Sequence, residues 1–303
     1  MGGAFFMDAR MTHARIGIIG GSGLYDFPVQ DEREVVVSTP WGAPSDAMRT
    51  GRVGQTEVVF LPRHGRGHVF SPSGINYRAN IAAMKHLGVT DIVSLSACGS
   101  FRQALHPGLF VLVDQFVDRT YRRESSFFGN GCVAHVSMAQ PVAPNLTRRL
   151  IEAAQLAEVA VHAGGTYVGI EGPQFSSLAE SLQYKASGFD VIGMTASTEA
   201  KLAREAEISY ACVAMVTDYD CWHPEHDVVD VAAVVAVMQR NAAAAQKLIA
   251  AFLRAFPALH EPCPIGSDRA LDNAIMTAPS RRDPVMVEKL QMIAARVLAK
   301  QGA

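Results

Sequence analysis

The sequence predicts an α/β protein with a central mixed, largely parallel sheet flanked by helices. Short apolar runs suited to buried strands alternate with segments of helical spacing along the chain. Glycines and small polar residues follow several of these runs, where parallel sheets place their ligands. The hydrophobic fraction of 49% and the net charge of −2 exclude a mainly disordered chain. We expect a flexible tail over residues 1–14, one domain over 15–256, and a C-terminal arm and helix over 257–303, packed on the domain or on a neighbouring subunit.

Apolar runs that end in Gly, Pro or Ser predict the strands of the first half. These strands are Arg15–Gly20, Val35–Ser38, Thr56–Pro62, Asp91–Leu95 and Leu109–Val113. Between them, residues 76–87 place Ile81, Met84 and Leu87 on one helical face and end at Gly88, which predicts a helix.

The second half begins with a predicted long loop, because residues 120–140 mix polar and aromatic side chains without a clear period. After it we expect helices over Asn145–Leu156, Ser177–Ser187, Ser197–Ala206 and Val228–Phe256, and strands over Thr166–Ile170, Val191–Met194 and Tyr210–Thr217. Asp283 and Pro284 have the residue types of an N-cap and a first helical position, so they predict a last helix over Val285–Leu298.

Composition and charge exclude several classes of protein. No run reaches 18 uncharged apolar residues, and the first 14 residues lack the apolar core of a signal peptide. The small net charge gives no overall basic field for nucleic acid. Five cysteines without a CxxC pair favour reduced thiols in a cytoplasmic protein over disulfides or a zinc site. A charged fraction of only 18% favours burial of surface between subunits.

Two loops after predicted strands have the residue types that bind an anion. Residues 20–23 read Gly-Gly-Ser-Gly, so backbone N–H groups can approach a phosphate closely and Ser22 adds a hydroxyl. Residues 63–68 read Arg-His-Gly-Arg-Gly-His, and the Arg63 guanidinium matches an oxyanion. The alternatives are a simple tight turn and a solvated basic turn. The first loop lacks the third glycine of a dinucleotide fingerprint and the lysine of a Walker loop.

Two further segments carry candidate chemistry. Residues 96–100 read Ser-Ala-Cys-Gly-Ser, whose small size lets a ligand lie against the backbone. Cys98 fits a small buried thiol better than a nucleophile, because no partner histidine is indicated nearby. Asp218 and Asp220 can bind a metal, act as acid and base, grip a base edge, or cap the next helix. A metal is disfavoured, because His223 and His226 have no recognisable ligand spacing.

Together these segments predict an oxyanion site from Ser22, Arg63, His64 and Ser96, and an acidic site from two aspartates. An enzyme that brings phosphate to a leaving group rich in hydrogen-bond donors needs both sites.

Six segments, in order, resemble the S-methyl-5′-thioadenosine phosphorylases of the trimeric purine nucleoside phosphorylase group. They are Gly17–Leu24, Arg63–Arg66, Asn76–Asn80, Ser96–Ser100, Ile170–Pro173 and Thr217–Trp222. The resemblance extends from about Arg15 to about Phe256. It implies a single-domain purine nucleoside phosphorylase-like fold, a homotrimer, and phosphorolysis of methylthioadenosine to adenine and 5-methylthioribose 1-phosphate. Inorganic phosphate is then a co-substrate, and we expect no metal or organic cofactor.

The resemblance also implies roles for individual residues. The phosphate site falls on Ser22, Arg63, His64, Ser96, Ala97 and Thr195. The purine falls between Phe175 and the acidic pair, with Met194 against the ribose. The methylthio group meets Val231, Val234 and Val235, with His135 contributed by the neighbouring subunit, while Ser176 and Val231 match positions that separate methylthio from hydroxyl substrates. Gln174 and Leu178 stand where the family pattern has Arg, and Gly193 stands where its better-known eukaryotic members have Asn.

In the expected reaction Asp218 must be protonated to donate to the purine N7, and Asp220 accepts from the 6-amino group of adenine. Four alternatives stay open. A 6-oxopurine (methylthioinosine) phosphorylase is disfavoured because an ionised Asp220 repels a 6-oxo group, and a nucleosidase would not need Arg63 and His64. A nicotinamide-dependent dehydrogenase is disfavoured because this sequence lacks the third glycine of the dinucleotide fingerprint. A non-enzymatic adenosine-binding module would release no adenine.

Overall fold

The computed structural model describes residues 12–21, 27–223 and 231–301. In this part of the chain an eleven-stranded sheet has the order β2-β3-β4-β1-β5-β10-β9-β7, and β11 joins β5 to β6, which pairs with β8. The strands are β1 Arg15–Gly20, β2 Gln30–Val35, β3 Met48–Val53, β4 Thr56–Pro62, β5 Asp91–Ser100, β6 Phe110–Val113, β7 Gln115–Asp118, β8 Val161–Ala163, β9 Thr166–Gly169, β10 Val191–Gly193 and β11 Ser209–Asp218. The central pairs β1–β4, β1–β5 and β5–β11 are parallel, whereas β2–β3, β3–β4, β5–β10 and β6–β11 are antiparallel, which confirms a mixed sheet.

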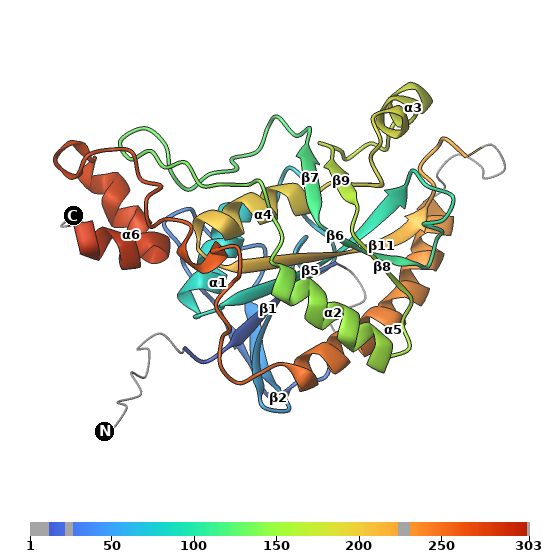
Figure 1. Ribbon diagram of the computed structural model, residues 1–303, viewed down its shortest axis with the longest axis horizontal. Coiled ribbons are helices and arrows are strands. Elements are labelled where there is room, and N and C mark those ends of the chain that lie inside the picture. Colours follow the sequence, from blue (N-terminus) through green and yellow to red (C-terminus); the bar gives the residue numbers. More distant parts are fainter. Residues whose placement is uncertain (1–11, 22–26, 224–230, 302–303) are drawn as a thin grey trace, which may run out of the picture.

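Helices cover both faces of the sheet, as Figure 1 shows. They are α1 Tyr77–His86, α2 Pro144–Leu156, α3 Leu178–Ala186, α4 Ala196–Glu205, α5 Val231–Ala255 and α6 Pro284–Leu298. On one face, α1, α4 and α6 contribute Ile81, Ala200 and Leu290 to a buried apolar cluster. On the other, α2 and α5 contribute Leu146 and Phe252 to a second cluster. The sheet is therefore buried between two cores, as a largely parallel sheet requires.

Capping explains where three predicted helices begin. The Asn76 side chain accepts a hydrogen bond from the Ala79 N–H at the start of α1. Asp283 does the same for the Met286 N–H at the start of α6. Ser177 forms a capping box with Glu180 at the start of α3. These bonds satisfy N–H groups that the first helical turn leaves without partners.

Several predicted strand boundaries are wrong. The chain leaves β2 at Val35, and Val36 is 87% exposed, so the expected strand Val35–Ser38 does not form. The hairpin of β2 and β3 was missed because its residues are largely polar and exposed. β5 continues through Ser100 instead of ending at Leu95, because β11 and β10 pair with its second half. The short strands β7 and β8 were also not predicted.

The segment between α5 and α6 runs back along the chain's own domain. Leu259 pairs with His13, and the buried Leu271 donates its N–H to Glu207 at the end of α4. Arg296 of α6 forms an ion pair with the same Glu207. These contacts hold α6 beside α1 at one end of the molecule (Figure 1).

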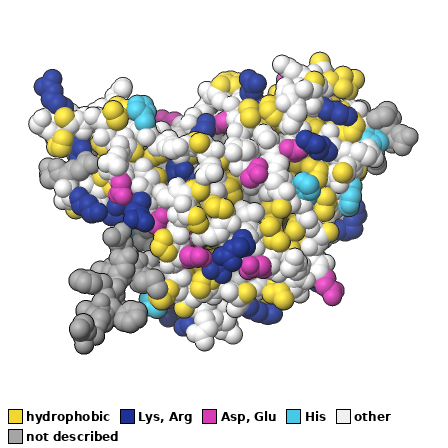
Figure 2. All heavy atoms as spheres, in the orientation of Figure 1, with side chains coloured by type: hydrophobic (Ala, Val, Ile, Leu, Met, Phe, Trp, Pro, Cys, Tyr) yellow, Lys and Arg dark blue, Asp and Glu magenta, His cyan; other side chains and the backbone are white. Residues whose placement is uncertain are grey.

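On the face that Figure 2 shows, basic, acidic and apolar side chains are interspersed, and neither positive nor negative charge dominates. Within the described ranges, no helix has the length and apolar character needed to cross a membrane. All five cysteines are free thiols.

Candidate functional site

A cavity of about 310 Å³ lies where β1, β4, β10 and β11 reach their carboxyl ends. It brings together most of the predicted site residues. Its lining includes Arg63, His64, Ser96, Ala97, Met194, Thr195, Phe175, Ser176, Asp218, Asp220 and Val234. Ligand binding at this edge of the sheet is typical of α/β proteins.

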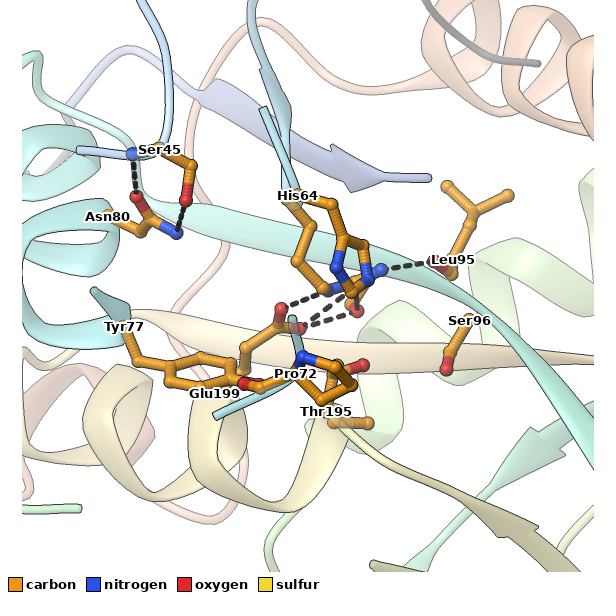
Figure 3. A network of polar contacts seen from close by, with 12 residues as sticks. Ser45, His64, Pro72, Tyr77, Asn80, Leu95, Ser96, Thr195 and Glu199 are labelled. Atoms are coloured by element: carbon orange, nitrogen blue, oxygen red, sulfur yellow. Dashed lines mark hydrogen bonds and ion pairs between the residues drawn. The ribbon is translucent and has the colours of Figure 1, made fainter. Parts of the chain in front are cut away.

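The Arg63 guanidinium is buried and already paired. Its Nε and Nη2 donate to the two carboxylate oxygens of Glu199, and it also donates to the Leu95 carbonyl and the Ser94 hydroxyl. Figure 3 shows Glu199 at the centre of this network. A guanidinium has five N–H donors, so these four bonds leave one for a ligand. Glu199 thus largely neutralises the charge of Arg63. An anion bound here would meet one directed N–H donor and little net positive charge.

His64 is neutral in this environment. Its Nδ1 lies 2.8 Å from the Phe70 carbonyl, which can only accept, so Nδ1 carries the hydrogen. Burial and the neighbouring Arg63 cation lower the pKa of His64 to about 4. The His68 ring stacks on it, with the ring centroids 4.0 Å apart. In neutral His64 the remaining nitrogen, Nε2, is a hydrogen-bond acceptor, which suits the O–H of a monoprotonated phosphate.

Thr195 sits at the N-terminus of α4, where the helix leaves backbone N–H groups without intrahelical partners. Its side chain makes no capping hydrogen bond. Ser96 and Ala97 line the cavity from within β5, which continues past the predicted strand end at Leu95. The helix N-terminus and these small residues together favour an anion.

A β-bulge brings the acidic pair to the cavity. The register between β11 and β5 shifts between Val216 and Asp218, so Thr217 is the extra residue. Bulges of this kind re-aim side chains beside functional sites. Asp218 accepts the Asp220 N–H at 2.8 Å, and its other oxygen lies 2.7 Å from the Thr217 hydroxyl. That hydroxyl also reaches the Cys98 carbonyl at 3.1 Å, so it can donate to an ionised Asp218 or accept from a protonated one.

Burial raises the pKa values of both aspartates, and for Asp220 the nearby Asp218 carboxylate adds to the effect. Asp220 has a φ of +52°, a left-handed conformation that aspartate tolerates better than most residues. One carboxylate oxygen of Asp220, Oδ2, and the Ser176 hydroxyl are buried without a hydrogen bond of good geometry, although the Ser176 and Ser181 hydroxyls lie near enough to Asp220 to oppose the rise in its pKa. Such atoms are costly unless a ligand satisfies them, so they mark this end of the cavity as a binding surface.

The apolar part of the lining differs from the expected set. Val234 and Met238, one turn apart on α5, both face the cavity. Val235 does not line it and is 44% exposed, because consecutive helical residues point about 100° apart. His135 is not among the residues that line its own cavity, and its backbone N–H donates to the Ala274 carbonyl.

Two predicted residues lie outside what the structure describes. Ser22 falls between the described ranges 12–21 and 27–223, and the side chain of Val231 is likewise outside the described part. Their roles stay predictions.

Cys98 lines the cavity, but burial raises the pKa of its thiol well above the ordinary value. A cysteine nucleophile needs the opposite shift. The interpretation of Cys98 as a small buried thiol therefore agrees with its surroundings.

Sequence reasoning missed Glu199 and Arg123. The buried Arg123 guanidinium donates to the backbone carbonyls of Met194 and Glu171, which flank the cavity. Both charges lie far along the chain from the groups they contact, so no local pattern marks them. Met238 could have been found, because it follows Val234 by four residues on the same helical face.

Comparison with known proteins places this site in a family. The model described as "Phosphorylase superfamily" matches residues 15–254. The S-methyl-5′-thioadenosine phosphorylase of Bradyrhizobium diazoefficiens is 60% identical, over 95% of this chain and 99% of that relative. The chain belongs to the S-methyl-5′-thioadenosine phosphorylase family.

Solved structures of methylthioadenosine phosphorylases have the same fold. One from an Antarctic soil metagenomic library is 44% identical, with a TM-score of 0.85 over 93% of this chain and 99% of that one. The enzyme from Schistosoma mansoni in complex with adenine is 40% identical, with a TM-score of 0.75 over 79% of this chain and 90% of that one. These likenesses confirm the expected nucleoside phosphorylase-like fold.

Proposed function

We infer that the protein catalyses phosphorolysis of S-methyl-5′-thioadenosine, giving adenine and 5-methylthioribose 1-phosphate. The observation that carries this inference is one cavity that holds both an anion-binding end and a buried acidic pair. The chain's membership of the methylthioadenosine phosphorylase family supports the same substrate.

The anion-binding end suits the phosphate nucleophile. Cleavage of the N-glycosidic bond leaves positive charge on the sugar, and a phosphate held beneath C1′ stabilises that charge and then captures the carbon. Thr195, Ser96 and the remaining Arg63 donor bind the phosphate, and His64 accepts its O–H. Ser22 and Ala97 complete the proposed phosphate site.

The acidic pair suits the leaving group. Asp218 in its protonated form donates to the purine N7, which would otherwise leave as an anion. Asp220 accepts from the 6-amino group through the oxygen that has no hydrogen bond of good geometry in the protein. Phe175 and Ser176 border the base, and Met194 lies against the ribose. These steps need no metal and no organic cofactor.

One assay separates the candidate functions. The protein is incubated with methylthioadenosine, methylthioinosine, adenosine and inosine, each with and without phosphate, and free base is followed. We expect phosphate-dependent release of adenine from methylthioadenosine. Release without phosphate would identify a nucleosidase, hypoxanthine as the main product would identify a 6-oxopurine phosphorylase, and no release would leave a binding module or a dehydrogenase.

The preference for an adenine base over a hypoxanthine base is expected to depend on Asp220. In Asp220→Asn the amide can donate to a 6-oxo group, so the ratio of kcat/KM for methylthioadenosine to methylthioinosine falls by ~5- to 150-fold, equivalent to ~1–3 kcal/mol for one buried hydrogen bond. Steady-state kinetics with both nucleosides measure this ratio. An unchanged ratio would remove Asp220 from the base site.

The choice of a methylthio group is expected to depend on Val234. A 5′-hydroxyl buried against valine loses its water partner, so adenosine is disfavoured by ~10- to 200-fold. Val234→Thr keeps the shape of the side chain and adds a hydroxyl that can bond to the 5′-hydroxyl of adenosine. We therefore expect the preference for methylthioadenosine over adenosine to become smaller. Val235→Thr is the matched control, because that side chain is exposed outside the cavity. If both variants keep the wild-type ratio of kcat/KM for the two nucleosides, Val234 belongs to the core alone.

We further propose a cytoplasmic homotrimer in which His135 closes a neighbour's cavity, with Val231 in the same 5′ pocket. His135 is not among the residues that line its own cavity, so the proposed role requires a second copy of the chain. Beside it, Val133 and Met276 are joined by a backbone hydrogen bond and are 38% and 65% exposed. Exposed apolar side chains of this kind suit a subunit interface.

Sedimentation equilibrium is expected to give three times the chain mass of 32.5 kDa. His135→Ala is expected to raise the nucleoside KM and leave the phosphate KM unchanged, because the histidine closes only the 5′ end. Full activity at the mass of a single chain would contradict this assembly.

A further inference from the structure

Tyr167 of β9 lies directly behind the phosphate end of the cavity. Its side chain is fully buried, and its hydroxyl is 3.4 Å from the Ser96 hydroxyl and 3.4 Å from the Thr195 backbone nitrogen. Ser96 and Thr195 line the cavity, whereas Tyr167 does not. Figure 3 shows these two cavity residues near one another, on different elements of the fold. The phenol therefore joins two phosphate-site residues from β5 and from the start of α4.

Gly193 supplies the space for this hydroxyl. A Cβ on Gly193 would lie 2.0 Å from the Tyr167 oxygen and 2.6 Å from the ring carbon that carries it. Gly193 sits in β10 without a left-handed φ, so its backbone conformation does not require glycine. The close approach of the Tyr167 hydroxyl therefore explains why glycine stands at position 193.

The directions of the hydrogen bonds give the hydroxyl a defined role. The Thr195 N–H can only donate, so the phenol oxygen accepts it. The phenol hydrogen then needs an acceptor of its own, and the Ser96 oxygen at 3.4 Å is within reach. Burial raises the pKa of Tyr167, so this hydrogen stays on the phenol. The Ser96 hydrogen is then left for another acceptor. In this structure the Ser96 hydroxyl donates to the Ala97 carbonyl at 3.3 Å, and a bound phosphate oxygen can take the place of that carbonyl.

We propose that Tyr167 is a positioning residue for phosphate, which orients the Ser96 hydroxyl and the start of α4, and that glycine at position 193 makes room for its ring. This proposal rests on the proposed function, because it concerns the same phosphate site.

The first test is Tyr167→Phe, which keeps the ring and removes only the hydroxyl. We expect the phosphate KM to rise ~3- to 10-fold, the scale of one net hydrogen bond. The nucleoside KM and the kcat at saturating phosphate should change less than twofold. Thr56→Val is the matched control, because it also removes a buried hydroxyl, which donates to the Leu253 carbonyl at 2.8 Å and does not line the cavity. It should lower thermal stability without raising the phosphate KM.

The second test adds a methyl group at position 193 and then removes the aromatic ring at position 167 to make room for it. Gly193→Ala alone should lower the unfolding temperature and raise the phosphate KM, because the new methyl group displaces the tyrosine ring. Combined with Tyr167→Met, which supplies a flexible side chain without the ring, Gly193→Ala should regain the unfolding temperature but keep the high phosphate KM.

A third measurement does not depend on turnover. Inorganic phosphate should raise the unfolding temperature of the wild type, because it binds the folded state, and should do so less for Tyr167→Phe at equal concentration. If the wild type binds phosphate but releases no adenine, the proposed function fails and this binding test still decides the role of Tyr167. An unchanged phosphate effect in Tyr167→Phe, or equal changes in both KM values, would show that the tyrosine is structural only.

Discussion

Asp218→Asn is expected to lower kcat for methylthioadenosine phosphorolysis by ~10²–10⁴-fold, the usual contribution of a general acid. The amide keeps the size of the side chain and an oxygen that can accept the Asp220 N–H. It cannot give up a proton to the purine N7, so the base has to leave as an anion.

An N7-methylated methylthioadenosine is the control substrate for this variant. Its purine already carries positive charge and leaves as a neutral base, so the acid is not needed. We expect Asp218→Asn to lose less than ~10-fold on this substrate, a small part of the general-acid effect. An equal loss on both substrates would show that Asp218 positions the base without protonating it.

The pH dependence of kcat provides a second measurement. Burial raises the pKa of Asp218, which enlarges its protonated fraction at any given pH. Because the proposed mechanism uses the protonated form of Asp218, kcat should be highest below this raised pKa and fall as the pH increases through it. Since the two aspartates interact, the profile reports apparent pKa values of the pair. Asp218→Asn should lack this decline.

Arg63→Ala is expected to have the largest effect on stability, because it leaves the Glu199 carboxylate buried without its cation. Each side chain of the pair is only 3% exposed. Removing one partner of a buried pair costs ~3–5 kcal/mol in the free energy of unfolding. We also expect the phosphate KM to rise far more than the nucleoside KM, since the proposed function assigns the lost donor to phosphate. Urea unfolding midpoints and steady-state kinetics measure the two effects separately.

A compensating variant separates these two roles of Arg63. Arg63→Met combined with Glu199→Gln removes both charges, and the glutamine can still accept from Ser94 and Tyr210. This double variant should regain most of the lost stability but keep the high phosphate KM. Arg66→Ala is the matched control, because this arginine of the same loop is 53% exposed in its side chain and its ion pairs contribute little. Recovery of the phosphate KM in the double variant would contradict a direct role of Arg63.

Much of the scaffold follows from local patterns in the sequence. The runs Arg15–Gly20 and Thr56–Pro62 form strands β1 and β4 with the predicted bounds. Their apolar residues are buried wherever the sheet is placed, so periodicity alone identifies them. Asn76 and Asp283 mark helix starts because a cap bonds to N–H groups only a few residues away.

The sequence by itself determined the fold class, the family and the segments that carry the chemistry, since each depends on neighbouring residues. Only the tertiary structure decided the electrostatics of the site. Glu199 is 136 positions from Arg63 and neutralises it, and Tyr167 is 71 positions from the Ser96 that it contacts. β5 extends through Ser100 because β11 and β10 supply partners, which no local propensity encodes. The pKa of His64 and the unsatisfied oxygen of Asp220 arise from burial, which exists only once distant segments pack together.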